Sequence, residues 1–60
     1  PMLLYNAACN FALLGRADEA LGALEQAVDR GYGDKNWIEH DSDFDSIRAT
    51  QRYQALVQTM

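Results

Sequence analysis

Two apolar stripes separated by a glycine constrain the fold of this 60-residue chain more strongly than any other feature. Each stripe follows the i, i+3, i+4, i+7 spacing of a helix that hides one side. The first comprises Leu4, Ala7, Ala8, Phe11 and Leu14, and the second comprises Ala17, Ala20, Leu21, Leu24, Ala27 and Val28. Gly15 stands between them, where a left-handed C-terminal cap belongs. We therefore predict a first helix over about residues 2–14 and a second from about residue 17, closed by Gly31 and Gly33 and folded back antiparallel.

The remainder of the chain continues in shorter helical patterns. Asp34 is placed to cap a short stretch that carries Trp37 and Ile38, and Thr50 is placed to cap a final helix. The apolar residues of the later segments are Phe44 and Ile47, and then Tyr53, Leu56, Val57 and Met60. No alternation typical of a strand competes with these patterns. The sequence therefore predicts an all-α fold, organised as a single module over residues 1–60.

The stretch LLYNAACNFALLGRADEALGALEQAVDRGY carries small, aromatic and acidic residues at fixed offsets. These residues are Tyr5, Asn6, Ala8, Phe11, Leu14, Gly15, Asp18, Glu19, Ala20, Leu24 and Ala27. In this spacing residues 1–32 resemble a tetratricopeptide repeat, the helix-turn-helix unit of α-solenoids. Leu4 stands in a slot that often holds Trp, and Gly31-Tyr32 replaces the usual acidic-Pro ending. The resemblance implies an antiparallel helix hairpin.

Residues 33–60 do not repeat this pattern. A shift by the family's period of about 34 residues puts polar side chains in five core slots, namely Asp41, Ser42, Asp45, Gln54 and Gln58. The segment instead resembles the helical tail that follows the last repeat in many bacterial tetratricopeptide proteins, including some kinases and nucleotide cyclases. Such a tail implies a C-terminal cap over the side that the hairpin leaves open, with Trp37, Ile38, Phe44, Ile47, Tyr53 and Leu56 as its apolar contacts.

Charge and composition exclude several classes of partner. The net charge is -4 and the five basic residues are scattered, whereas nucleic acids and anionic lipids recruit clustered Lys and Arg. No apolar run approaches the roughly 20 residues that span a bilayer. Cys9 is the lone cysteine, so one chain cannot build a disulfide framework. We therefore expect a cytoplasmic protein that binds neither nucleic acid nor membrane.

The acidic stretch HDSDFDSIR, residues 40–48, is the segment that most resembles a metal site. Its alternating aspartates are Asp41, Asp43 and Asp45. In a calcium loop the required glycine and the closing glutamate would then fall on Ser46 and Arg52. We therefore interpret the stretch as a helix start, with Ser42 as its cap and Asp45 three residues later.

The other candidates for chemistry are a lone histidine and a lone thiol. His40 has no second His or Cys at ligand spacing, and Cys9 has no cation or base beside it in the sequence. We predict neither a metal ligand nor a nucleophile at these positions. The sequence thus predicts a chain with no catalytic residue, no cofactor and no metal site.

The candidate partner-binding residues come from the resemblance. In tetratricopeptide arrays the first helix of each repeat lines a concave groove, and the matching positions here are Tyr5, Asn6, Cys9, Ala12 and Leu13. Asn6 resembles an asparagine that holds a peptide backbone or a terminal carboxylate in chaperone-binding members. An equally weighted reading is that Tyr5 and Leu13 contact a preceding repeat.

The resulting functional prediction is a non-catalytic protein–protein interaction module at the C-terminal end of a longer solenoid, binding a protein or peptide. One alternative is a structural end cap or a homodimer, formed through the unfinished side of the hairpin, that binds no peptide. Another is the regulatory tail of a larger signalling enzyme such as a kinase or cyclase.

Overall fold

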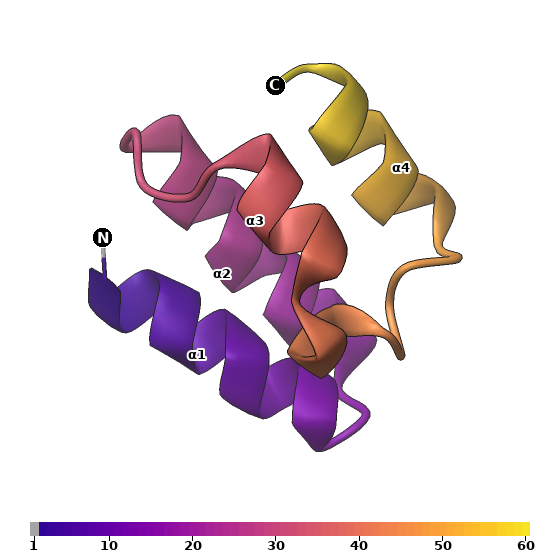
Figure 1. Ribbon diagram of the computed structural model, residues 1–60. Coiled ribbons are helices and arrows are strands. Elements are labelled where there is room, and N and C mark those ends of the chain that lie inside the picture. Colours follow the sequence, from indigo (N-terminus) through magenta and orange to yellow (C-terminus); the bar gives the residue numbers. More distant parts are fainter. Residues whose placement is uncertain (1) are drawn as a thin grey trace.

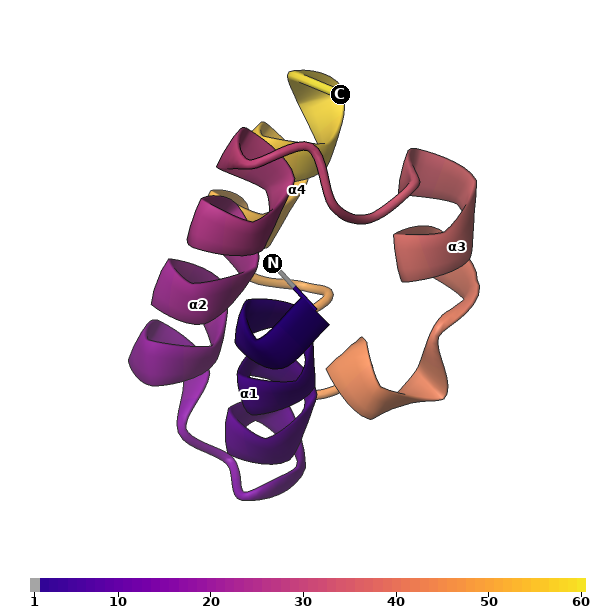
Figure 2. The same ribbon diagram turned by 90° about the vertical axis from the view of Figure 1, so that its left-hand side faces the viewer.

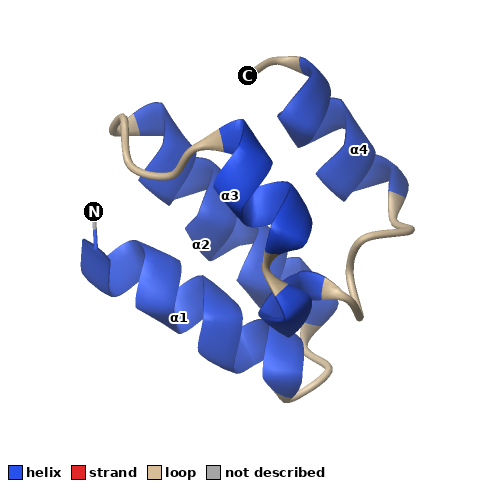
Figure 3. Cartoon of the chain, in the orientation of Figure 1, coloured by secondary structure: helices blue, strands red, loops and turns tan. Residues whose placement is uncertain are grey.

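The computed structural model describes residues 2–60, whose regular elements are all helical (Figures 1 and 3). In chain order they are α1 (Met2–Leu13), α2 (Ala17–Asp29), α3 (Lys35–His40), the 3₁₀ turn η1 (Ser42–Phe44) and α4 (Gln51–Gln58). No strand occurs between residues 2 and 60, and the predicted all-α fold is confirmed. Pro1, which the sequence places in the single module, lies outside the described residues.

Glycines in the left-handed region end both long helices. After α1, the amide of Arg16 donates to the carbonyl of Phe11 at 2.9 Å. The amide of Gly15, with φ +78°, donates to the carbonyl of Ala12 at 3.1 Å. This pair of bonds is a Schellman motif, and Gly31 closes α2 in the same way with φ +83°. The turn predicted at Gly15 is therefore confirmed, with α1 ending one residue earlier than expected.

Small side chains line the contact between α1 and α2, which lie side by side and antiparallel (Figure 1). Ala8, Ala20 and Ala27 are completely buried, so the two helix backbones approach closely. Leu21 and Leu24 fill the space beside them and are also inaccessible to solvent. Leu14, which the sequence counts in the first stripe, is 70% exposed because the helix has already ended at Leu13.

The C-terminal segment completes the core. Ile38, Phe44 and Ile47 are fully buried, and Tyr53 is 3% exposed. Figure 2 shows α3 and η1 on one side of α1 and α4 on the far side of α2. These four side chains belong to the same buried core as the residues between α1 and α2.

Trp37 corrects one expectation about this cap. Its side chain is 49% exposed, although the sequence predicts that it covers the open side of the hairpin. The neighbouring residue Ile38 points into the core, and successive residues of a helix are turned by about 100°. Trp37 consequently lies at the edge, with its ring centroid 5.2 Å from that of Tyr5 and 6.0 Å from that of Tyr32.

Side-chain caps set where the short helices begin. Asp34 accepts the amide of Trp37 at the start of α3, and Thr50 accepts the amide of Tyr53 at the start of α4, as the sequence predicts. The cap of η1 is different from the prediction. Asp41, not Ser42, accepts the amide of Asp43 at 3.0 Å. A hydrogen bond from an amide to the side chain of an aspartate two residues earlier closes a short turn. Ser42 is the first residue of η1 and therefore lies within this turn.

Replacing Phe44 by Ala tests how far the fold depends on the C-terminal segment. The ring is fully buried, so we expect a loss of about 3–5 kcal/mol in the free energy of unfolding, which is most of what a domain this small has. Urea denaturation followed by circular dichroism measures it. Leu3→Ala, at a side chain that is 79% exposed, is the control and should change stability by less than about 0.5 kcal/mol. Similar midpoints for both variants would contradict this account of the core.

Candidate functional site

The inner side of α1, where sequence reasoning placed a groove, is covered by the C-terminal segment of the same chain. Tyr5, Cys9 and Ala12 are 4%, 9% and 1% exposed. The hydroxyl of Tyr5 donates to Asp41 at 2.8 Å, and the hydroxyl of Ser46 donates to the carbonyl of Ala12 at 2.8 Å. These three candidate residues therefore contact the chain itself and offer no surface to a partner in this conformation.

The other two candidate residues lie on the adjoining, solvent-exposed side of α1. Asn6 and Leu13 are exposed, in a group that we call the outer strip: Met2, Leu3, Asn6, Asn10, Leu13 and Leu14. At 100° per residue the five of these positions within α1 cover an arc of about 100°, and Leu14 follows the last residue of the helix. Met2, Leu3, Leu13 and Leu14 are 58%, 79%, 65% and 70% exposed. The structure thus separates the five predicted residues into a buried group of three and an exposed group of two.

The outer strip carries no charge. The first charged residue of the chain is Arg16, beyond the end of α1. Exposed helix surfaces in water normally carry charged side chains, and a helix that is apolar on all sides is normally buried. In Figure 2, α1 lies between α2 and the η1 segment, and its remaining side is not covered by another helix. This uncharged exposed side is the feature of the molecule most typical of an interface.

Arg48 holds the C-terminal segment together and was not singled out by the sequence. Its guanidinium donates to the carbonyl oxygens of Glu39 and Asp41, to the hydroxyl of Tyr53 at 3.0 Å and to the carboxylate of Asp45 at 3.2 Å. The last carbonyls of a helix have no partner within it, and here the arginine donates to that of Glu39 and shares that of Asp41 with the amide of Phe44. The sequence pattern does not predict this role, because most partners of Arg48 are backbone atoms, which every residue has.

A thiol and two carboxylates lie under the C-terminal segment. Potential ligand atoms of Cys9, Asp41 and Asp43 lie within 4.8 Å of one another. Burial, and then the neighbouring carboxylates, raise the pKa of Cys9 to about 11, so the thiol is protonated at neutral pH. Both carboxylate oxygens of Asp41 already accept hydrogen bonds, one from Tyr5 and one from the amide of Asp43. The group therefore contributes polar contacts between α1 and the C-terminal segment.

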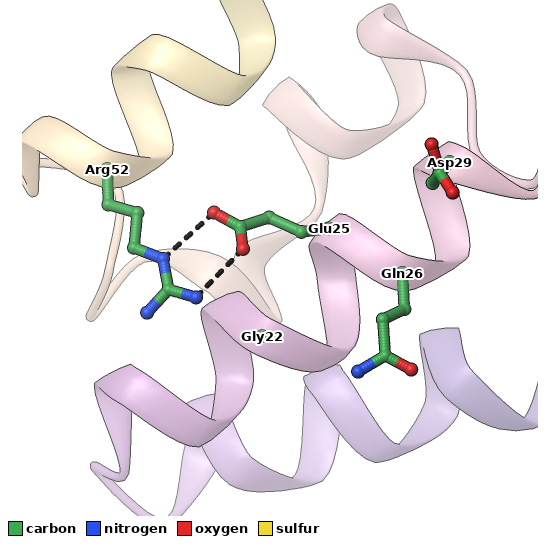
Figure 4. Close-up of a pocket in the computed structure, with 5 residues that line it drawn as sticks. All are labelled: Gly22, Glu25, Gln26, Asp29 and Arg52. Carbon is green, nitrogen blue, oxygen red and sulfur yellow. Dashed lines mark hydrogen bonds and ion pairs between the residues drawn. The ribbon is translucent and has the colours of Figure 1, made fainter.

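An open depression between α2 and α4 is lined mainly by residues with polar side chains and holds an ion pair (Figure 4). It is lined by Gly22, Glu25, Gln26, Asp29 and Arg52. Arg52 donates to both carboxylate oxygens of Glu25, each at 2.8 Å, which lowers the pKa of Glu25. The guanidinium is thereby turned toward the protein, and the pair ties α4 to α2 across the depression.

The helices of residues 2–60 are all too short, or too polar, to cross a membrane. No family model matches the chain. No solved structure matches it either. The chain is similar to a chloroplastic protein of Arabidopsis thaliana, with 34% identity over 53 residues. The match covers 88% of this chain and spans 16% of the length of that relative.

Replacing Arg48 by Met tests its role. The change removes the only side-chain donor to the carbonyl of Glu39 and one of two donors to that of Asp41, which keeps the amide of Phe44, and it also removes the bonds to Tyr53 and Asp45. We expect the free energy of unfolding to fall by about 1–3 kcal/mol in urea denaturation. Arg16→Met is the matched control, since its pair with Glu19 is solvent-exposed on both sides and worth at most about 1 kcal/mol. Equal losses of unfolding free energy in the two variants would show that the bonds from Arg48 to the backbone add no more stability than an exposed ion pair.

Alkaline pH should destabilise the fold through the inner side of α1. The folded pKa of Cys9, about 11, lies above its ordinary value of 9.0, so the thiol stabilises the fold below about pH 9 and loses this effect as pH rises to 11. Burial and the bond to Asp41 also raise the pKa of Tyr5, which extends the loss to higher pH. Melting temperatures between pH 8 and 11 measure the effect. Cys9→Ala should flatten the profile in this range, and an unchanged profile would refute the assignment.

Proposed function

We infer that this chain is a non-catalytic protein–protein interaction module, a tetratricopeptide-like hairpin with a C-terminal cap, which packs the outer strip of α1 against a helix of a protein partner. The observation that carries this proposal is the uncharged, exposed side of α1. Four of its large apolar side chains are more than half exposed. Burying such a surface against another helix removes it from water, which contributes a favourable free energy of about 25 cal/mol per Å² of apolar area.

The geometry favours this surface over the inner groove. Tyr5 and Ala12 already contact residues of the C-terminal segment. A peptide would have to displace Phe44 and break the hydrogen bonds of Asp41 and Ser46 to reach this side of α1. Partner contacts are therefore assigned to Asn6 and Leu13 and their neighbours on the outer strip. The apolar residues supply the contact area, and Asn6 and Asn10 supply hydrogen bonds that fix its register.

A neighbouring hairpin in a longer polypeptide is one partner of this kind. In helical repeat proteins each hairpin covers the side that the next one leaves open. The similarity to the chloroplast protein supports this arrangement, since the matched region is 16% of a longer chain. The packed C-terminal segment would then serve as the end of the array, because it covers the inner side of α1.

Fusing a tetratricopeptide hairpin of known stability ahead of residue 2 tests the proposed function. If the outer strip packs on the added hairpin, the two parts unfold in one transition with a midpoint above that of either part. Leu13→Asp in the fused chain should separate the transitions, since a charge would be buried at the contact. Ala49→Asp, at an exposed position outside α1, is the control and should leave the single transition intact. Two independent transitions in the unsubstituted fusion would overturn the proposal.

A further inference from the structure

The outer strip has the same chemistry when it is read in either direction. Its residues pair around the level of Ala8: Leu3 with Leu13, Asn6 with Asn10, and Met2 with Leu14. Two copies of α1 laid antiparallel, with a twofold axis passing beside Ala8, would bring these positions opposite one another. Leucine would then meet leucine and methionine at both ends, and asparagine would meet asparagine near the centre. A twofold interface requires this kind of self-complementarity.

We propose that a second copy of this chain occupies the outer strip, bound antiparallel through α1 about this twofold axis. This inference rests on the proposed function, because it requires the outer strip to be an interface. It goes further by naming the partner and the register. The amide side chains of Asn6 and Asn10 each have a donor and an acceptor, so opposed asparagines can satisfy one another across the interface.

The charge distribution favours the same face. The chain has a net charge of -4, so two copies repel each other over most approaches. Every charged residue lies outside residues 1–15, and the outer strip is where two copies can meet without opposing like charges. In the antiparallel register Arg16 of each copy falls beyond the start of the other α1. The buried centre of the interface is thus free of charge.

The size of the strip sets the expected affinity. Twelve helical residues span about 18 Å, so the contact is smaller than the roughly 800 Å² per partner of a typical stable complex. We therefore expect a weak dimer, with a dissociation constant of about 10 μM to 1 mM. Sedimentation equilibrium over this concentration range measures the mass of the chain directly.

Two complementary charge variants test the antiparallel register. Leu3→Glu and Leu13→Lys place a charge at opposite ends of the strip, where both side chains are largely exposed, so the fold should be retained. Each change also suits the helix macrodipole, with the acid near the N-terminus and the base near the C-terminus. Each variant alone should weaken self-association at least tenfold. An equimolar mixture should restore a heterodimer, because the glutamate introduced in one chain would meet the lysine introduced in the other, while the second Leu3–Leu13 pair remains.

The matched controls are Ala49→Glu and Gln58→Lys, which make the same charge changes at exposed positions outside α1 and should leave the dimer intact. A native chain that stays monomeric up to 1 mM overturns the proposal. Variants that stay monomeric when mixed overturn the antiparallel register. If the native chain is monomeric but the fused hairpin still couples through Leu13, only this inference fails. If both experiments are negative, the outer strip is not an interface and the proposed function fails with it.

Discussion

The packing of the C-terminal segment onto the hairpin is the constraint on which the rest of the structure depends. Two helices of 12 and 13 residues are short for independent stability, and a pair of them leaves one side of its apolar surface open. Ile38, Phe44 and Ile47 close that side and are completely buried. The hairpin and the C-terminal segment therefore share one core, and neither can be treated as an attachment to the other.

Polar contacts give this packing its orientation. Asp41 accepts from the hydroxyl of Tyr5 and from the amide of Asp43, so the same carboxylate starts η1 and fixes it against α1. Arg48 closes the end of α3 and reaches the hydroxyl of Tyr53 in α4. An acidic and a basic residue of the stretch 40–48 thus connect three helices. The stretch that resembles a metal loop in sequence works as a structural junction.

The position of this segment changes which side of α1 is available. The inner side contacts the chain's own residues, and the outer strip stays exposed without a charged side chain. A helix packed on one side and uncharged on the other has room for one more neighbouring helix. The proposed interaction function and the proposed twofold pairing both follow from this division of a single helix into two surfaces.

The sequence by itself determined the helices and most of their ends, because these depend on local chemistry. Apolar spacing predicted both long helices, and Gly15, Asp34 and Thr50 act where their backbone preferences place them. The start of η1 could not be predicted in the same way, because Asp41 and Ser42 are both favourable capping residues. In the structure Asp41 is the residue that caps η1. Arg48 gave no local signal, because its partners at the end of α3 are backbone carbonyls nine and seven residues away.

Only the tertiary structure decided which side of α1 faces the C-terminal segment. The spacing of apolar residues identifies a buried side when the other side is charged, but α1 has no charged residue on either side. Tyr5, Cys9 and Ala12 could therefore not be distinguished from Asn6 and Leu13 as surface residues. The distinction came from long-range packing, in which the bulk of Phe44 and the bond between Tyr5 and Asp41 select one side of the helix.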